Sequence, residues 1–490
     1  MQILISLRLI FLFLMGFSLS MFTPLIVVFA YHETDMRLFI YSGVFTFFVG
    51  LIGYLCLRRF TQPLNNFGGF FVVTVFWISF SFFAALPFFL SMYSPLDFTS
   101  ALFETVSGFT TSSVTTLTNL DQFPKSLLFY RQQLEFFGGM GMVTLAIALM
   151  PSLNTGAALK LYLPEDANPN YDESLIQEPT DTLIYNIRLT WILYAVLTIV
   201  CAVAYWIAGM QPLDAVGMSF SSVSTGGFVM YDANFAYFNH LNFMIIAEIF
   251  MLIGALNFNL HLKALRARSL KPYWQDTETR VYFALIITVI LFTLYMLDSH
   301  HFYANTQEAI KQTTFNVISI MTTTGYMSAP YASWPSYIPY LLMMAALIGT
   351  AGNSTGGGLK ILRFWLVLKC IYAELQNLVQ PTFKNRMRVS GKHVDEMLIR
   401  GILAFFCVYI AWIAVTIFWL IDLGLDLHSA FGAVVACLSN VGLGIGQYAY
   451  NFHGIGHPAE WLLMITMIAG RLEIFALLVL FMPSLWELSS

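Results

Sequence analysis

Length, composition and charge indicate a membrane protein. The 490 residues are 58% hydrophobic and only 10% charged, whereas soluble domains carry about 25% charged residues. Apolar stretches long enough to cross a bilayer, roughly 20 residues each, recur from end to end, and no long polar segment remains for a separate soluble domain. The net charge of −4 excludes little, but the composition excludes a soluble enzyme and predicts one integral membrane domain.

Ten apolar segments predict the membrane-spanning helices. The first is longer than the apolar region of a signal peptide, which has about 7–15 residues, so we expect a retained helix. The eighth is interrupted by a glycine-rich run. The ten segments are residues 3–30, 37–57, 67–92, 126–150, 183–209, 239–262, 281–298, 335–375, 398–423 and 458–484.

Basic residues gather in alternate connections between these segments. One set of connections holds Arg58 and Arg59, the run from Lys263 to Arg280 and the run from Lys360 to Arg400, whereas the opposite set holds few, such as Lys125. Lys and Arg are enriched in cytoplasmic loops. We therefore expect the basic set in the cytoplasm, together with both termini.

The connections on the opposite side contain an internal repeat. Each of four connections begins with turn or cap residues, continues for about three helical turns and ends in a run of small polar residues. A single such run near a membrane surface would be an ordinary loop, but four runs in the same setting predict four re-entrant pore loops. The connections are 95–125, 211–235, 303–334 and 425–457, and their polar runs close at Ser113, Gly227, Gly325 and Gly442.

Re-entrant loops of this kind predict a cation pore. Backbone that is not helical cannot face lipid, so the four loops must surround one axis. Their carbonyl oxygens can replace the hydration shell of a monovalent ion, and the carboxyl ends of the preceding helices favour a cation. Glycine supplies the positive φ that a filter strand needs, and Glu104 and Asp121 would draw cations or act only as caps. The predicted K⁺-binding filter residues are Thr110, Thr111, Ser112, Ser113, Ser224, Thr225, Gly226, Gly227, Thr322, Thr323, Thr324, Gly325, Ser439, Asn440, Val441 and Gly442.

The predicted fold is an all-α integral membrane protein. Four helix–pore loop–helix units surround one pore, and an extra helix pair precedes them. A secondary carrier would instead show two inverted repeats, whereas these four share one orientation. The predicted divisions are 1–62 for the N-terminal helix pair, then 63–153, 154–262, 263–380 (with an intramembrane loop) and 381–490 for the four pore repeats.

Over nearly its full length the chain resembles the Trk-type potassium uptake proteins, whose superfamily also holds bacterial Ktr and plant and fungal transporters. The resemblance implies channel-like potassium uptake across the bacterial inner membrane, a homodimer with a pore in each protomer, and a cytosolic nucleotide-binding subunit that gates it. The strings that carry it are FYRQQLEFFGGMGMVTLAIALMP (129–151), VSTGGF (223–228), MTTTGYMS (321–328), GTAGNSTGGGLKILRF (349–364), LSNVGLGIG (438–446) and AGRLEIFALLVLFMP (469–483).

A glycine-rich run at 349–360 interrupts the eighth segment. Glycine and small polar residues cannot maintain a stable helix in the middle of a span. We expect an intramembrane loop just inside the filter, and the resemblance implies that it obstructs the path and must move. A plain cytoplasmic turn is the alternative, because Lys360 and Arg363 resemble interfacial residues.

Arg471 is the second predicted element of the gate. It lies within the last apolar segment, where an ionisable residue marks a pathway, and the resemblance places it beside the loop. Pairing with Glu473 or an interfacial anchor are the alternatives. The predicted gate residues are Gly352, Asn353, Ser354, Thr355, Gly356, Gly357, Gly358, Lys360 and Arg471.

Ser113 departs from the family pattern, which usually has glycine in the first filter loop. In plant relatives a serine at this position goes with sodium transport. Serine resists positive φ, so we expect one carbonyl to turn off axis, a hydroxyl to face the ion and K⁺ to be less favoured over Na⁺. The alternative function is therefore a sodium-permeable or sodium-coupled cation transporter.

No pattern in the sequence indicates an enzyme. The apolar-segment acids Glu135 and Glu248 lie in different repeats without a partner motif, and the five cysteines and nine histidines lack metal-ligand spacing. We expect no covalent cofactor, a nucleotide only through the regulatory subunit, no nucleic-acid partner, and the lipid bilayer as the surroundings.

Overall fold

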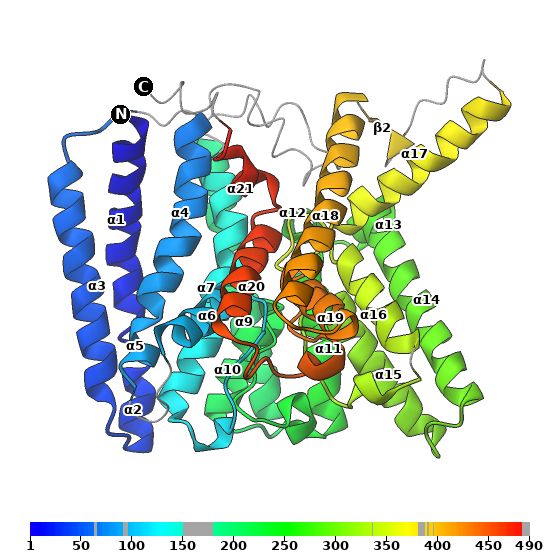
Figure 1. Cartoon of the computed structure of the whole chain (residues 1–490), viewed down its shortest axis with the longest axis horizontal. Coiled ribbons are helices and arrows are strands. Elements are labelled where there is room, and N and C mark those ends of the chain that lie inside the picture. Colours follow the sequence, from blue (N-terminus) through cyan, green and yellow to red (C-terminus); the bar gives the residue numbers. More distant parts are fainter. Residues whose placement is uncertain are drawn as a thin grey trace.

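The computed structural model describes residues 1–62, 66–91, 97–149, 180–335, 337–380, 388–389, 392–394 and 396–482. Helices account for nearly all of its regular structure, and the expected all-α membrane fold is confirmed (Figure 1). The strands in these ranges are two residues long: β1 (Arg388–Val389) and β2 (Lys392–His393) pair antiparallel, with Arg388 opposite His393.

The N-terminal helix pair stands at one edge of the molecule (Figure 1). It consists of α1 (Gln2–Ser20), the short α2 (Leu25–Tyr31) and α3 (Met36–Leu57). Glycine lets α1 and α3 approach closely, because a Cβ atom on Gly50 would lie 2.9 Å from the carbonyl oxygen of Phe11.

Four units follow, each with a pore helix of 12 or 16 residues between two flanking helices. The first has α4 (Asn66–Ala84), α5 (Leu86–Phe89), α6 (Phe98–Phe109), the 3₁₀ turn η1 (Leu120–Gln122) and α7 (Lys125–Leu149). The second has α9 (Thr180–Ile207), α10 (Pro212–Val223), η3 (Asn234–Phe238), α11 (Leu241–Ala255), α12 (Phe258–Ala267) and α13 (Lys271–Gln275). The third has α14 (Thr277–Ser299), α15 (Thr306–Met321), η4 (Tyr331–Ser333), α16 (Tyr337–Ile348) and α17 (Ile361–Val379). The fourth has α18 (Glu396–Asp422), α19 (Leu427–Leu438), η5 (Gly446–Tyr448), α20 (His457–Arg471) and α21 (Phe475–Val479).

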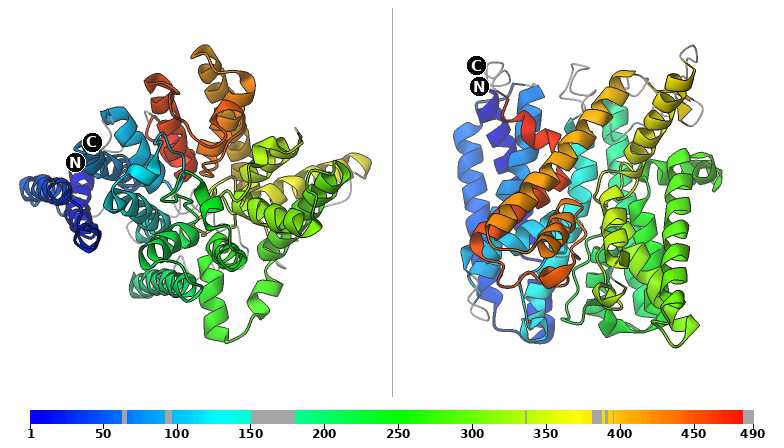
Figure 2. Two further views of the ribbon diagram at one scale, coloured as in Figure 1. Left: turned by 90° about the horizontal axis from the view of Figure 1, so that it is seen from below. Right: turned by 45° about the vertical axis from the view of Figure 1, so that its right-hand side comes forward.

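The units surround a common centre, and the view from below in Figure 2 shows the segments that follow the pore helices meeting there. Two apolar cores support this arrangement. One joins the N-terminal pair and the first unit to the fourth, and the other lies mainly between the second and third units. Neighbouring units therefore share a core.

Six described helices are long and apolar enough to cross a membrane, or seven if the bent pair α11–α12 counts as one span. That pair differs from the predicted segment 239–262, because the chain turns by 97° after Ala255. The cause is local: Leu256 and Asn257 are extended, and the Asn257 side chain caps α12 by accepting from the backbone N–H of Asn259 at 2.9 Å.

The last predicted segment, 458–484, is also broken. Glu473 and Ile474 have φ values of 55° and 52°, so α20 ends at Arg471 and a short α21 follows. Arg471 therefore lies at a helix end and not in the middle of a continuous span. Of the predicted divisions, the one between residues 262 and 263 falls inside α12, and the one between 153 and 154 lies outside the described residues.

Candidate ion pathway

The four pore helices end in the same way. In each, the second residue after the end of the helix is left-handed, and the N–H of the residue that follows it donates to the carbonyl five residues earlier in the chain, which is the Schellman motif. Because these bonds satisfy the carbonyls that a helix end leaves free, the chain can leave the helix deep inside the protein. The bonds run from Ser112 N to Ser107 O (2.8 Å), Gly226 N to Ser221 O (2.8 Å), Thr324 N to Ser319 O (2.9 Å) and Val441 N to Ala436 O (3.0 Å).

Positive φ recurs at two positions of every loop, with one residue between them. This is the alternation expected of a filter strand. The first position is threonine in three loops and asparagine in the fourth. The φ values are 54° and 62° for Thr111 and Ser113, 51° and 92° for Thr225 and Gly227, 55° and 81° for Thr323 and Gly325, and 53° and 83° for Asn440 and Gly442.

The three filter glycines leave no room for a side chain. A Cβ atom on Gly227 would collide with the carbonyl oxygen of Thr324, and one on Gly325 with that of Val441. A Cβ atom on Gly442 would lie 2.5 Å from the carbonyl oxygen of Ser112. Each glycine thus abuts the loop of the next unit, so the four loops close a ring in sequence order.

Ser113 places its side chain inside this ring. Its Oγ lies 2.5 Å from the position that a Cβ atom of Gly227 would take, and its Cβ lies 3.6 Å from the corresponding position of Gly325. Its φ of 62° is left-handed like those of the glycines, so the backbone change that we expected at this residue is absent. The departure from the pattern is a hydroxymethyl group between the loops, with the backbone alternation kept.

Glu104 supports the first filter strand from behind. Its carboxylate accepts hydrogen bonds from the N–H of Thr116 (2.6 Å) and the hydroxyl of Thr115 (2.8 Å). It also forms an ion pair with Arg131 of α7 at 3.1 Å, and both side chains are at most 2% exposed. The prediction that Glu104 draws cations from solution is therefore wrong, since its charge is buried and paired.

Arg131 joins the first filter strand to the second. Its guanidinium donates to the hydroxyl of Thr115 (3.1 Å) and lies 4.0 Å from the ring centroid of Phe228, the residue after the second filter glycine. A cation over an aromatic face is attracted by the ring. One α7 side chain thus fixes the spacing of two adjacent strands.

Two further side chains of α7 hold the second strand. Glu135 accepts from the N–H of Phe228 (2.8 Å) and the hydroxyl of Ser221 (2.5 Å), and Gln132 donates to the carbonyl of Phe228 (2.9 Å). Both are buried. Glu135, which has no partner motif in the sequence, therefore joins the second pore helix to the strand that follows it.

The third and fourth strands have different supports. Asn316, at the same place in its pore helix as Glu104, donates to the hydroxyl of Ser328 (3.0 Å) and accepts from the Ser328 N–H (3.3 Å). The hydroxyl of Tyr331 donates to the carbonyl of Gly444 beyond the fourth filter glycine. The ring is therefore similar in backbone but different in the side chains that hold each quadrant.

A vestibule of about 290 Å³ lies over the ring. Ser113, Gly227 and Gly442 form part of its lining, with Asp232 and His453 beside them. Asp232 is the acidic side chain in this lining, and it is exposed. Asp121, which the sequence suggested would draw cations, does not line the vestibule.

The glycine-rich run lies against the other side of the ring. Residues 349–360 are buried apart from the half-buried Asn353, which excludes the plain cytoplasmic turn. The N–H of Gly357 donates to Thr323 Oγ1 (2.8 Å), and Thr355 Oγ1 lies 3.2 Å from Thr225 Oγ1. The loop therefore contacts the ends of two pore helices directly below the filter.

Backbone and charged groups fasten this loop to the surrounding helices. Thr355 N–H donates to Gly254 O (3.1 Å) and Gly352 N–H to the carboxylate of Glu278 (2.8 Å). Lys360 folds back to donate to Gly356 O (2.7 Å). The remaining predicted loop residues, Ser354 and Gly358, lie in the same buried run.

Arg471 connects the loop to the first unit. Its guanidinium donates to the carbonyls of Thr355 (2.7 Å) and Gly138 (3.0 Å) and is 1% exposed. Glu473 forms an ion pair with Arg363 of α17. The burial of Arg471 excludes the interfacial anchor, and its positive charge lies beside the loop.

The supporting residues Arg131, Gln132, Glu135 and Asn316 were not predicted from sequence. Ionisable residues inside an apolar segment mark functional positions, so Arg131 and Glu135 carried a detectable signal. Their partners, however, lie up to 97 residues away in the chain, as Phe228 does from Arg131, and no local pattern identifies them.

Comparisons with known proteins agree with this geometry. A family model described as TrkH, cation transport protein, matches residues 36–488. The Trk system potassium uptake proteins TrkH of Salmonella typhimurium and Escherichia coli are each 37% identical over 480 residues, covering 98% of both chains. The crystal structure of the potassium transporter TrkH from Vibrio parahaemolyticus superposes with a TM-score of 0.91 at 35% identity, covering 99% of this chain and 100% of that chain.

Proposed function

Because the chain belongs to the TrkH family of cation transport proteins, a family of transporters and not of enzymes, we propose that it takes up potassium across the bacterial inner membrane. The substrate comes from the names of relatives that match nearly its whole length. Uptake follows a channel-like path and is driven by the membrane potential.

The ring of four Schellman-capped loops is the observation that carries this proposal. Carbonyl groups of alternating backbone can surround a dehydrated monovalent cation, and the four helix carboxyl ends behind them contribute partial negative charge. The buried pair of Glu104 and Arg131 holds the strands in place without adding net charge to the ring. We assign ion selection to the predicted filter residues on these grounds.

Residues 349–360 and Arg471 form the proposed gate. The loop lies below the filter, held by hydrogen bonds from Arg471 and to Thr323. A fixed positive charge at this point raises the barrier to a cation waiting in the filter. Conduction then requires the loop to leave its contacts with the pore helices.

A sodium-permeable transporter is the second candidate function, and the side chain of Ser113 favours it. The hydroxyl lies between the loops, where it can act as a ligand that the other three quadrants lack. A mixed set of carbonyl and hydroxyl ligands fits a K⁺-sized ring less well and admits the smaller Na⁺.

The test is ion flux through purified protein in liposomes and reversal potentials in opposed K⁺ and Na⁺ gradients. We expect electrogenic K⁺ uptake, and Ser113→Gly should raise the permeability ratio of K⁺ over Na⁺. The exposed Ser333→Gly is the matched control and should leave the ratio unchanged. Folded protein without K⁺ flux contradicts the proposed function, and an unaltered ratio in Ser113→Gly contradicts the sodium alternative.

Shortening the loop within residues 351–358 tests the gate. The shortened protein should conduct faster, because fewer contacts hold the path closed. Thermal unfolding of the same sample shows whether it is folded, and a folded variant with unaltered or abolished flux contradicts the assignment.

The quaternary arrangement completes the proposal. The names of the relatives refer to a Trk system, which supports further components, and we propose a homodimer gated by a cytosolic nucleotide-binding subunit. Both termini and the basic connections face the cytoplasm on the positive-inside argument. The division into an N-terminal pair and four pore repeats remains part of this proposal.

A further inference from the structure

The 97° bend after Ala255 places α12 across the ends of the neighbouring helices. Helix α12 is amphipathic, with Phe258 and Leu262 buried and Lys263 and Arg266 exposed. A helix that presents apolar residues on one face and basic residues on the other lies in the membrane interface. Trp274, on the α13 segment that follows, is 76% exposed, and tryptophan is enriched at that level of the bilayer.

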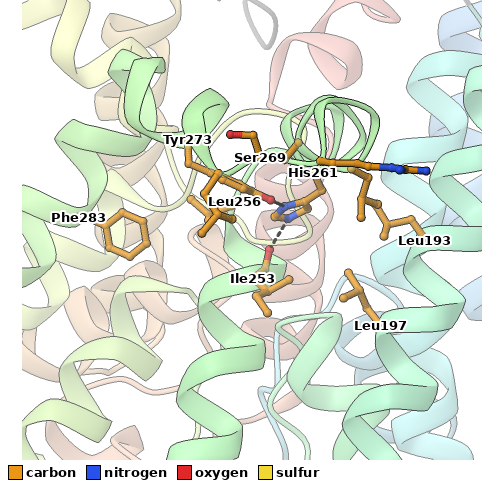
Figure 3. A pocket seen from close by; sticks show the side chains of 12 residues that line it. Leu193, Leu197, Ile253, Leu256, His261, Ser269, Tyr273 and Phe283 are labelled. Atoms are coloured by element: carbon orange, nitrogen blue, oxygen red, sulfur yellow. Dashed lines mark hydrogen bonds between the residues drawn. The ribbon is translucent and has the colours of Figure 1, made fainter.

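A cavity of about 720 Å³ lies beneath α12. Figure 3 shows it between Leu193 and Leu197 of α9 and Phe283 of α14, with Leu256 and Ile253 behind. Most of its lining residues are apolar, and its volume falls within the range of about 300–1,000 Å³ typical of ligand sites.

His261 fastens the roof of this cavity. One ring nitrogen lies 3.0 Å from the carbonyl oxygen of Ile253 and the other 2.7 Å from the hydroxyl of Tyr273 (Figure 3). Both nitrogens are thus engaged, and the side chain is buried. The histidine ties α12 to α11 and α13, so the cavity is a built feature of the bend.

The cavity opens among apolar and basic side chains. Leu265 and Leu270, which line it, are 62% and 70% exposed, so apolar surface continues from the cavity to the outside. Arg268 also lines it, and Lys271 begins the next helix. Among the described residues, no acidic side chain forms an ion pair with either one.

We propose that this cavity binds an anionic phospholipid of the adjacent leaflet. One acyl chain enters between α9 and α14, and the phosphate lies against Arg268 and Lys271 at the mouth. An apolar chain with a negative head matches the two parts of the site: basic side chains beside a membrane attract anionic lipid, and the apolar lining takes the chain. The site goes beyond ion transport, because it needs neither the filter nor an ion.

The site also adjoins the loop below the filter. Ile253 lines the cavity, and the next residue, Gly254, accepts the hydrogen bond from Thr355 of the loop. Phe258, at the start of α12, donates its N–H to the carbonyl of Asn353 at 3.1 Å. A bound lipid would therefore brace the helices to which the loop is attached.

Native mass spectrometry of the full-length protein tests the proposal. Detergent-solubilised protein is mixed with phosphatidylglycerol or with phosphatidylcholine of the same acyl chains, and the retained lipid is counted. We expect phosphatidylglycerol to be retained at least about tenfold more strongly. Arg268→Gln should reduce its retention about tenfold, whereas Leu197→Trp, which fills the cavity without changing charge, should abolish retention of both lipids.

Lys263→Gln is the matched control, because it removes one positive charge from α12, close to Arg268 in the chain but outside the cavity lining. It should bind phosphatidylglycerol like the unaltered protein. Equal retention of the two lipids overturns the proposal, as does an equal loss in Lys263→Gln and Arg268→Gln, which would indicate general surface attraction. A shift from dimer to monomer in Leu197→Trp, with lipid retention unchanged, also overturns it and assigns the face to a second copy. Thermal unfolding of each variant excludes misfolded samples, and none of these readouts depends on transport.

Discussion

Replacing Glu104 by glutamine should strongly destabilise the protein. The substitution keeps the shape of the side chain and an oxygen that can still accept from the Thr116 N–H, but it removes the charge that pairs with Arg131. The Arg131 side chain is 2% exposed and cannot turn to solvent. Removing one partner of a buried ion pair costs about 3–5 kcal/mol, and at about 1.4 kcal/mol per tenfold change this exceeds a hundredfold in the folding equilibrium.

The measurement is reversible unfolding of the purified protein in mixed micelles. Glu308→Gln is the matched control: Glu308 pairs with Lys311 at 3.8 Å on another pore helix, but its side chain is 44% exposed. Exposed pairs contribute about 0–1 kcal/mol, so this variant should stay within that range. Equal losses in the two variants, or a Glu104→Gln protein as stable as the original, would refute the reasoning.

The double variant Glu104→Gln with Arg131→Met identifies the cause of the loss. Neither charge then remains buried, and methionine fills much of the arginine's volume, so most of the lost stability should return. A double variant that is no more stable than Glu104→Gln alone would show that the strand contacts of Glu104, and not the unpaired Arg131, account for the effect.

The other predictions concern the gate, a close packing contact and pH. Arg471→Ala removes two charge-assisted hydrogen bonds, each contributing about 1.5–3 kcal/mol, so K⁺ flux should rise at least about tenfold, and a flux no higher than that of Arg471→Lys would contradict this. Gly138→Ala should lower the free energy of unfolding by more than about 2 kcal/mol, because the Cβ atom of the alanine would collide with the carbonyl oxygen of Phe109. Gly401→Ala, with open space around it, should stay within about 0.5 kcal/mol in the same unfolding assay. The carboxylate of Asp97 caps the first pore helix. Although partial burial acts to raise its pKa, hydrogen bonds and a nearby histidine outweigh burial and hold the pKa below 3.8. The contribution of this carboxylate to the free energy of unfolding is therefore present at neutral pH and is lost as the pH falls through the lowered pKa. The stability difference between the original protein and Asp97→Asn should shrink below about pH 4, and a difference that grows on acidification would contradict the sign.

Local patterns in the sequence were enough to find the pore loops. The helices α6, α10 and α19 each have 12 residues, close to the predicted three turns, and every loop leaves its helix where the polar run begins. The hydropathy pattern, the small polar residues and the Schellman hydrogen bonds all depend on residues that are a few positions apart in the chain. The bend after Ala255 was missed because the apolar run continues through it, and only the cap formed by Asn257 ends the helix there.

The sequence by itself determined the membrane class, the positions of the four loops and the family. Only the tertiary structure decided which groups meet: the carboxylate of Glu104 turned to Arg131, the Ser113 side chain between the loops, and Arg471 bonded to Gly138, 333 residues away in the chain. The physical reason is how far apart in the chain the interacting residues lie. Hydropathy and helix capping depend on neighbours along the chain, whereas burial and pairing of a charge depend on how distant helices pack.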